Sequence, residues 1–253
     1  MKFDLFELAG QVAVVTGCNT GLGQAMAVAL AEAGADIVGI NKSAPVDTCR
    51  AVEALGRRFL DLRADLADIA VIPRLIAEAQ TLTGHVDILV NNAGIIRRED
   101  ALHFRVSDWD EVMAVNLKAA FFLAQALARL CIEQGRGGKI INVASMLSFQ
   151  GGIRVPSYTA SKSGVMGLTK ALANEWAAHG INVNAIAPGY MATNNTAALQ
   201  ADEARNAAIT ARIPAGRWGK PADMAGPVVF LASQSSNYVN GYTLAVDGGW
   251  LAR

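Results

Sequence analysis

Tyr158 and Lys162 are the residues whose types and spacing most directly suggest chemistry. They stand four apart in Ser157-Tyr-Thr-Ala-Ser-Lys162, and Ser145 lies thirteen residues before the tyrosine. Residues i and i+4 share one helix face, so the phenol and the ammonium can reach the same small volume. A phenol with a pKa of about 10 is a weak acid–base catalyst at neutral pH, and a neighbouring cation is expected to lower that pKa. Tyr158 is therefore a candidate for moving a proton, Lys162 for tuning it, and Ser145 for holding a carbonyl oxygen.

The elements that must position these side chains alternate between short apolar runs and longer helical patterns. Seven runs are expected to be strands: Val12–Thr16, Ile37–Ile40, Phe59–Leu62, Val86–Val90, Lys139–Val143, Ile181–Ile186 and Tyr242–Val246. Helical patterns separate most of them, as at Leu22–Ala33 and Ser157–Ala178. Continuously apolar strands with helices between them predict a parallel sheet covered on both faces. We therefore expect one doubly wound α/β domain of the Rossmann type over residues 1–253, with strand order 3-2-1-4-5-6-7.

One segment departs from this alternation. Between Pro188 and Pro221 the sequence becomes polar and irregular. Long excursions at the carboxyl end of a strand often contribute to a ligand site. Residues 189–218 are therefore expected to form a substrate lid, and a surface insertion is the alternative.

A glycine-rich turn, Thr16-Gly-Cys-Asn-Thr-Gly-Leu-Gly23, joins the first predicted strand to the first predicted helix. Its glycines permit close approach of the backbone to a ligand, and free N–H groups at the helix start favour a pyrophosphate. The spacing differs from G-x-G-x-x-G, and a plain turn is the alternative, but the strand before and the helix after favour nucleotide binding. The candidate contacts are Gly17, Asn19, Thr20, Gly21, Leu22 and Gly23.

Two later segments are also placed to meet a nucleotide. Asp65, followed by Leu66, comes after the third predicted strand, where a carboxylate could accept from an adenine amine; a helix-entry residue is the alternative. Asn91-Asn-Ala-Gly94 closes the fourth strand with small residues that would let a flat ring approach the backbone, although it could be a plain turn. The candidate contacts there are Asn92, Ala93 and Gly94.

Together these motifs resemble the short-chain dehydrogenase/reductase family. The matching positions are Thr16–Gly23, Asn91–Gly94, Asn116, Ser145, Tyr158 with Lys162, and Pro188-Gly189 followed by Thr193. They occur in the family's order and span nearly the whole chain. The resemblance implies metal-free, NAD(P)-dependent oxidoreduction of an alcohol–carbonyl pair.

The resemblance also implies a role for each matching residue. Tyr158 would be the acid–base, Lys162 would also hold the nicotinamide ribose, and Ser145 would orient the carbonyl. Asn116 would hold a water molecule in a proton relay. The contacts expected with the cofactor near its nicotinamide end are Tyr158, Lys162, Pro188, Gly189 and Thr193.

Within the family, residues 95–100, 145–158, 187–195 and 247–253 resemble dehydrogenases of keto-deoxy sugar acids from bacterial hexuronate or pectin breakdown. That similarity implies a sugar-acid substrate and a homotetramer. A guanidinium suits a carboxylate, and four arginines fall near the expected carboxyl edge: Arg97, Arg98, Arg154 and Arg217. Each alone could be a surface charge. The candidate substrate contacts are Ser145, Tyr158, Arg154 as first choice for the carboxylate, Arg97, Gln150, Met191 and Asn194.

The choice between NAD and NADP depends on the end of the second strand, Ile40-Asn41-Lys42. An acid there would bind the ribose 2′-OH and repel a 2′-phosphate. Asn41 lacks that repulsion, and Lys42 could attract the phosphate. We expect Asn41 to contact NAD, with NADP as the alternative.

Composition argues against several other classes of protein. The 253 residues include 22 basic and 22 acidic residues, which favours neither nucleic acid nor an anionic membrane as a partner. Three scattered cysteines and three histidines favour neither a disulfide framework nor a metal site, and they suit a cytoplasmic location. The N-terminus is unlike a signal peptide, and no membrane span is expected. An NADPH-dependent reductase of a 3-oxoacyl thioester and a nucleotide-sensing regulator without catalysis are the competing functions.

Overall fold

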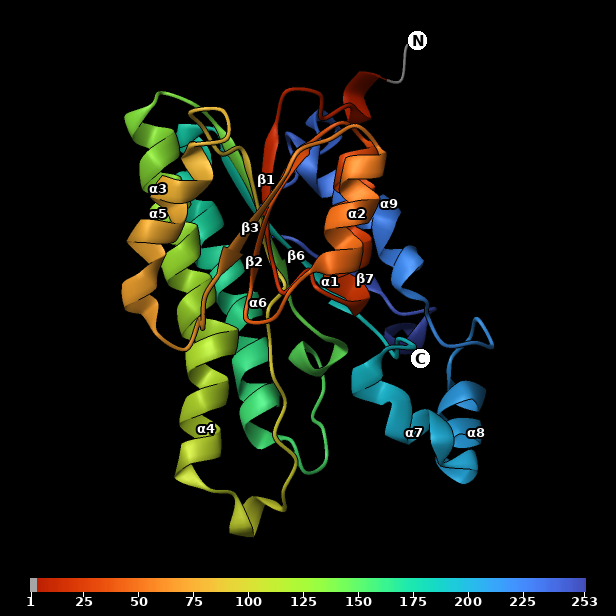
Figure 1. The fold of residues 1–253 in the computed structure, drawn as a ribbon. Coiled ribbons are helices and arrows are strands. Elements are labelled where there is room, and N and C mark those ends of the chain that lie inside the picture. Colours follow the sequence, from red (N-terminus) through yellow and green to blue (C-terminus); the bar gives the residue numbers. More distant parts are fainter. Residues whose placement is uncertain (1–3) are drawn as a thin grey trace.

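A seven-stranded parallel sheet divides the molecule into two helical layers in the computed structural model, which describes residues 4–253 (Figure 1). The order is β3-β2-β1-β4-β5-β6-β7, which confirms the prediction. The strands are β1 (Val12–Thr16), β2 (Asp36–Asn41), β3 (Phe59–Arg63), β4 (Ile88–Asn91), β5 (Gly138–Val143), β6 (Ile181–Pro188) and β7 (Thr243–Val246). Residues 1–3 lie outside the described residues. They are part of the N-terminal segment that we expected to be unlike a signal peptide.

Helices cover both faces of the sheet. They are α1 (Gly21–Glu32), α2 (Val46–Ala54), α3 (Ile72–Gln80), α4 (Val106–Met113), α5 (Ala119–Glu133), α6 (Pro156–Trp176), α7 (Ala197–Ala201), α8 (Glu203–Arg212) and α9 (Ala225–Ala232). Successive residues of a strand point to opposite faces. Val12 and Val14 therefore pack in the core with α3, α5 and α6, whereas Ala13 and Val15 pack in the core with α1, α2 and α9. Figure 1 shows these two groups of helices on opposite sides of the sheet.

The chain changes direction across the sheet between β3 and β4. The first three strands run outward in the order β1, β2, β3, and β4 then pairs with β1 on its other side. Ligands of open parallel sheets bind beyond the carboxyl ends of the strands at such a switch point. The fold therefore directs the loops after β1, β4 and β5 toward one crevice.

One long helical stretch combines α4, a π-helical turn (Ala114–Lys118) and α5. By length and composition this stretch, Val106–Glu133, is apolar enough to cross a membrane, which the sequence analysis did not expect. Half of its most apolar window is buried inside the fold. The α5 side chains that are buried belong to the core shared with α3 and α6, so packing against the sheet accounts for their apolar character.

The polar segment after β6 forms α7 and α8, which project from the sheet beside its carboxyl edge (Figure 1). Aromatic side chains contribute to its packing together with Ile209 and Ile213. The ring of Tyr190 lies edge-on to Trp218 and Trp250, with centroid distances of 5.2 and 4.8 Å. The segment is thus joined to the C-terminal residues of the chain.

Candidate active site

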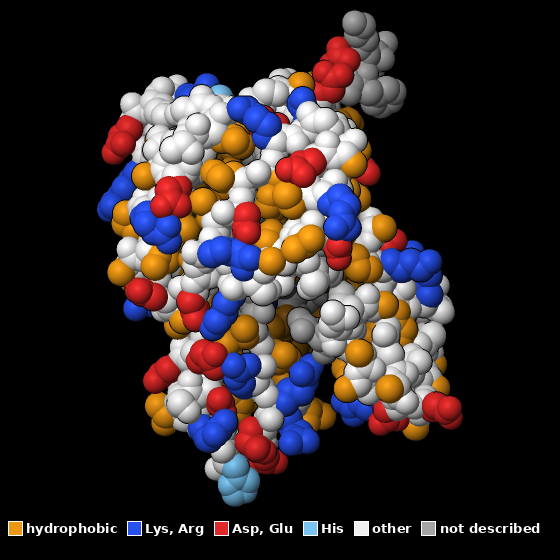
Figure 2. Space-filling model, in the orientation of Figure 1, with side chains coloured by type: hydrophobic (Ala, Val, Ile, Leu, Met, Phe, Trp, Pro, Cys, Tyr) orange, Lys and Arg blue, Asp and Glu red, His pale blue; other side chains and the backbone are white. Residues whose placement is uncertain are grey.

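A cavity of about 1000 Å³ opens at the carboxyl edge of the sheet, between the α4 side of the molecule and the α7–α8 projection. Figure 2 shows this region as a hollow between two projections. Every residue predicted to bind the nucleotide lines the cavity, and so do Ser145, Tyr158 and Lys162. Among the predicted substrate contacts, Gln150, Arg154, Met191 and Asn194 also line it. The structure therefore brings together residues that are far apart in the sequence.

The turn after β1 is shaped for close approach to a ligand. Gly17 and Gly21 have φ values of 64° and 61°, in the left-handed region that favours glycine. A Cβ on Gly23 would collide with the carbonyl oxygen of Gly17 and the side-chain nitrogen of Asn92. Thr20 caps α1 without a side-chain hydrogen bond, so the first backbone N–H groups of this helix keep their donors for an anion.

Asn92 lines the cavity, but its amide also holds the nucleotide turn in place. Its Nδ2 donates to the carbonyl oxygens of Thr16 and Gly17, both at 2.9 Å. The hydroxyl of Thr16 accepts in turn from the backbone N–H groups of Asn92 and Ala93, at 3.0 and 2.9 Å. These bonds join the ends of β1 and β4 across the switch point.

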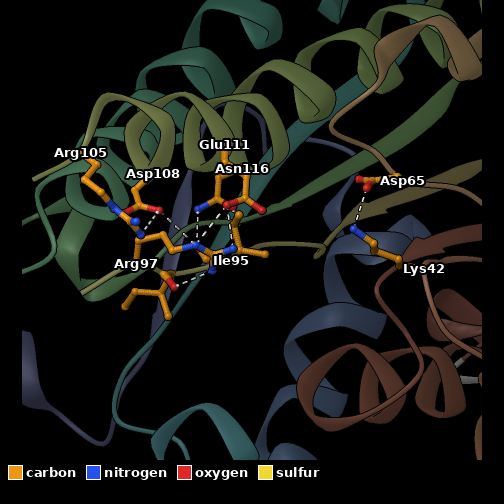
Figure 3. A network of polar contacts seen from close by, with 9 residues as sticks. Lys42, Asp65, Ile95, Arg97, Arg105, Asp108, Glu111 and Asn116 are labelled. Carbon is orange, nitrogen blue, oxygen red and sulfur yellow. Dashed lines mark hydrogen bonds and ion pairs between the residues drawn. The ribbon is translucent and has the colours of Figure 1, made fainter. Parts of the chain in front are cut away.

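The end of β2 presents one amide and one ion pair to the cavity. Asn41 is 2% exposed; its Nδ2 donates to the sulfur of Cys18 at 3.5 Å, and its Oδ1 has no hydrogen-bond partner. Lys42 Nζ lies 2.6 Å from Asp65 Oδ2 (Figure 3). The hydrogen bond from Lys42 is the largest cause that lowers the pKa of the Asp65 carboxyl. Lys42 and Asp65 therefore stand at the cavity as a pair of opposite charges.

Lys162 and Tyr158 line the cavity from α6. Lys162 Nζ donates to the carbonyl oxygen of Val143 at 2.6 Å and lies 5.7 Å from the centroid of the Tyr158 ring. Lys162 is 4% exposed, and burial lowers its pKa to about 8. The ammonium is thus anchored at the end of β5, close to the phenol without being directed at its oxygen.

The pKa of Tyr158 is raised, so the lowering expected from the sequence is wrong. Burial is the largest cause, because it disfavours the charged phenolate. The hydroxyl of Ser145 and the charge of Arg98 act in the opposite direction. Ser145 lies at the end of β5, where its Oγ accepts from the backbone N–H of Leu147 at 3.1 Å.

A pH titration checks this electrostatic balance. Without nucleotide, the Tyr158 phenol should stay protonated up to at least its ordinary pKa of 10, because the folded environment raises that value. The measurement is phenolate absorbance against pH, taken as the difference between the wild type and Tyr158→Phe. A titration step in that difference well below pH 10 would contradict the prediction.

Asn116 lies on the π-helical turn between α4 and α5 and is 2% exposed. Its Oδ1 accepts from the backbone N–H of Ile95 at 2.8 Å, and its Nδ2 donates to the carbonyl of Ile95 at 2.9 Å (Figure 3). Isolated π-turns inside helices are frequent at functional sites. Asn116 therefore fixes the backbone that follows Gly94 from behind the cavity wall, and its part in a proton relay stays a prediction.

The structure places two of the four arginines outside the cavity lining. Arg97 is outside the cavity lining: its Nη2 lies 2.7 Å from Glu111 Oε2, and its Nε lies 3.8 Å from Asp108 Oδ1 (Figure 3). Arg217 is likewise held by Asp223 at 2.8 Å. Both guanidinium groups are thus paired with carboxylates, and a substrate would have to compete with these carboxylates for them.

Arg154 lines the cavity in an unusual backbone conformation, with a φ of 63°. Its carbonyl oxygen accepts from the N–H of Glu99 at 3.0 Å, and its guanidinium lies 3.7 Å from the Glu99 carboxylate. Non-glycine residues in the left-handed region are uncommon and concentrate at functional sites. Arg154 thus remains a candidate, with its charge partly compensated.

Two further arginines in the cavity were missed. Arg205 and Arg212 line it from α8, and Trp250 lines it from the C-terminus. A spacing of seven places both arginines on one face of a helix. This spacing of two arginines in the expected lid could have identified them as candidate contacts from the sequence alone.

Comparison with known proteins gives close relatives over the whole chain. Residues 17–251 match a family described as enoyl-(acyl carrier protein) reductase. The chain is 68% identical over 253 residues, all of both chains, to a 2-dehydro-3-deoxy-D-gluconate 5-dehydrogenase of Escherichia coli strain K12. A proposed 2-deoxy-D-gluconate 3-dehydrogenase of Agrobacterium tumefaciens with bound NADP has a TM-score of 0.93 and 60% identity, covering 98% of this chain and 99% of that chain. A gluconate 5-dehydrogenase of Burkholderia cenocepacia J2315, in complex with NADP and tartrate, has a TM-score of 0.93 and 40% identity, covering 99% of this chain and 98% of that chain.

The doubly wound sheet and the cavity with Ser145, Tyr158 and Lys162 define an oxidoreductase that works with a nicotinamide nucleotide. The chain belongs to the short-chain dehydrogenase/reductase family, which confirms the resemblance read from its motifs.

Proposed function

We propose that this chain interconverts a secondary alcohol and a ketone on a keto-deoxy sugar acid of bacterial hexuronate or pectin breakdown, with NAD preferred. The observation that carries the proposal is a single cavity in which Ser145, Tyr158 and Lys162 face several cations. The arginines lining it are Arg98, Arg154, Arg205 and Arg212. A guanidinium suits a carboxylate, and the relative that is 68% identical carries the name of a sugar-acid dehydrogenase.

The residues at the nucleotide end fit a dinucleotide. The open N-terminus of α1 leaves backbone N–H groups available to a pyrophosphate, and the absence of a Cβ at Gly23 lets the turn before this helix pack tightly. Asn41 Oδ1 is buried and has no hydrogen-bond partner within the described residues, so it can accept a hydrogen bond from a ribose hydroxyl. When bound, the nicotinamide supplies a hydride acceptor for the carbon that is oxidised.

The proton chemistry belongs to the side chains. During oxidation, the ionised oxygen of Tyr158 takes the proton of the substrate hydroxyl as the hydride leaves the same carbon, so the raised pKa of this phenol has to fall when nucleotide and substrate are bound. Ser145 donates a hydrogen bond to the oxygen that becomes the carbonyl, and the Lys162 ammonium stabilises the ionised phenol. During reduction the proton moves the other way.

The charges near Asn41 support the proposed preference for NAD. The ammonium of Lys42 is bound to Asp65 at 2.6 Å, so its charge is compensated before a 2′-phosphate arrives. Asp65 also adds a negative charge that a 2′-phosphate would meet. Solved relatives with bound NADP, such as those of Agrobacterium tumefaciens and Burkholderia cenocepacia, are the observation against this preference.

The test is reduction of NAD⁺ and NADP⁺, followed by absorbance, with 2-keto-3-deoxygluconate as substrate. The wild type is expected to favour NAD⁺ in kcat/KM by about 10-fold, a difference of about 1.4 kcal/mol. Asp65→Asn should narrow or invert the preference, because it releases the Lys42 ammonium. Better turnover with NADP⁺ would overturn the NAD assignment. Tight nucleotide binding without turnover of the sugar acid would overturn the substrate class.

An NADPH-dependent reductase of a 3-oxoacyl thioester is the second candidate. Its support is the description of the matched family, which names an acyl-carrier-protein substrate. It shares the same catalytic positions, so the substrate pocket has to discriminate. Reduction of an acetoacetyl thioester with NADPH that is faster than reduction of the sugar-acid ketone would favour this candidate.

The proposal includes residues 189–218 as a lid. A Cβ added to Gly21 would lie within 4 Å of the Thr193 side chain, so the segment approaches the nucleotide turn across the cavity. It also includes the homotetramer and cytoplasmic location expected from the sequence. The outer face of α5 and α6 carries partly exposed apolar side chains, Phe121, Ile132 and Trp176, around a shallow hollow that a second copy could cover.

A further inference from the structure

Arg212 stands at the end of α8 with its guanidinium stacked on an aromatic ring. The central carbon of the guanidinium lies 3.9 Å from the ring centroid of Trp250. Both residues line the cavity, Trp250 from the C-terminal segment and Arg212 from the expected lid. A cation over an indole face is attracted by the ring electrons, so the stacking holds this flexible side chain in one place.

Trp250 is itself fixed from several sides and serves as a platform. It is 4% exposed, and its Nε1–H donates to Gln150 Oε1 at 3.2 Å. The ring of Tyr190 packs edge-on against it at 4.8 Å, and its cluster of buried side chains includes Met146, the neighbour of Ser145. Through this cluster, the position of Arg212 is set relative to the residues that would do the chemistry.

Three other arginines near the cavity are already paired with carboxylates. Arg97 pairs with Glu111, Arg217 with Asp223, and Arg154 is 3.7 Å from Glu99. Arg212 has no ion pair within residues 4–253, and its guanidinium instead contacts the face of the Trp250 indole. Stacking occupies the face of the guanidinium and leaves its in-plane N–H groups available for a planar anion.

We propose that Arg212 binds the carboxylate of the substrate and that Trp250 is the positioning residue that holds it there. The inference rests on the proposed function and differs from the first choice of Arg154 for this contact. The reacting carbon would lie at Ser145 and Tyr158, and the acid end would point toward α8. A substrate with a carboxylate would then be contacted by α8 at its acid end and by the catalytic side chains at its reacting carbon.

The test compares Arg212→Gln with Arg205→Gln, because both arginines line the cavity from the same helix and only Arg212 is stacked. The substrates are 2-keto-3-deoxygluconate and its uncharged methyl ester, and NAD⁺ affinity is measured in parallel. Losing one charge-assisted contact should raise KM for the acid by about 10- to 100-fold in Arg212→Gln, with a smaller change in kcat. The discrimination against the ester should shrink by a similar factor. Arg205→Gln should keep most of that discrimination, and Arg212→Lys should be intermediate.

The outcomes separate this inference from the proposed function. Wild-type turnover with unchanged KM and discrimination in Arg212→Gln would overturn the carboxylate contact and leave the function standing. An equal loss in Arg205→Gln would also overturn it, because a general charge effect would then suffice. Absence of turnover in the wild type would overturn the proposed function. The carboxylate contact would still be supported if calorimetry showed that the wild-type NAD⁺ complex binds the sugar acid and that the Arg212→Gln complex does not. If the wild-type complex binds no sugar acid, both proposals fail.

Discussion

Tyr158→Phe is expected to lower kcat for alcohol oxidation by about 10²- to 10⁴-fold, the usual contribution of a positioned acid–base group. The change removes one oxygen from a side chain of α6 that lines the cavity. The ring remains, so the packing of α6 should be preserved. NAD⁺ affinity should change little, because the turn after β1 and Asn41 are untouched. Steady-state kinetics and an equilibrium titration with NAD⁺ measure the two effects separately.

Tyr190→Phe is the matched control for this variant. Tyr190 also lines the cavity, but its ring packs between Trp218 and Trp250. Loss of its hydroxyl should change kcat by at most a few-fold. If both variants lost activity equally, Tyr158 would have no special part in the proton transfer. If Tyr158→Phe retained wild-type kcat, another group would have to move the proton.

The fold was predictable from the sequence because the sheet is buried on both faces. Such strands need continuous apolar runs, and Val12–Thr16 was found with the observed bounds of β1. The predicted run Ile37–Ile40 was short by one residue at each end of β2, Asp36–Asn41. Asp36 can begin a buried strand because Arg58 lies 2.6 Å from its carboxylate. A partner distant in the sequence thus decides where the strand begins.

The site was only partly predictable. Spacing and strand ends sufficed to bring Tyr158, Lys162 and Ser145 to one cavity. The electrostatics were not predictable, because the carbonyl of Val143 takes the Lys162 ammonium and burial raises the pKa of the phenol. Sequence spacing fixes which side chains share a helix face, but it does not report desolvation.

The arginines show the same limit. Arg97 is adjacent in sequence to Arg98, yet Glu111 on α4 holds the first, whereas the second lines the cavity. Arg212 depends on stacking with Trp250, thirty-eight residues later in the chain. These partnerships depend on how separate elements pack, which local patterns do not encode.

Gly23→Ala is expected to weaken NAD⁺ binding by at least about 10-fold and to lower Tm by several degrees. The new Cβ would overlap the carbonyl oxygen of Gly17 and the Nδ2 of Asn92. Asn92 Nδ2 is itself bound to the Gly17 carbonyl at 2.9 Å, so neither group can move without loosening the turn. Overpacking of this kind costs about 1–3 kcal/mol, and about 1.4 kcal/mol corresponds to a tenfold change in affinity. Thermal unfolding and an NAD⁺ titration measure both effects.

Gly226→Ala separates this effect from the general consequences of adding a methyl group to a helix. Gly226 lies in the first turn of α9, and a Cβ there would meet no atom within 4 Å. Alanine should leave Tm unchanged or raise it, since glycine costs up to about 1 kcal/mol in a helix. Wild-type NAD⁺ affinity in Gly23→Ala would mean that the turn does not hold the pyrophosphate. Because Tyr158→Phe should keep nucleotide affinity and lose kcat, whereas Gly23→Ala should lose affinity first, the two variants distinguish the binding of the nucleotide from the transfer of the proton.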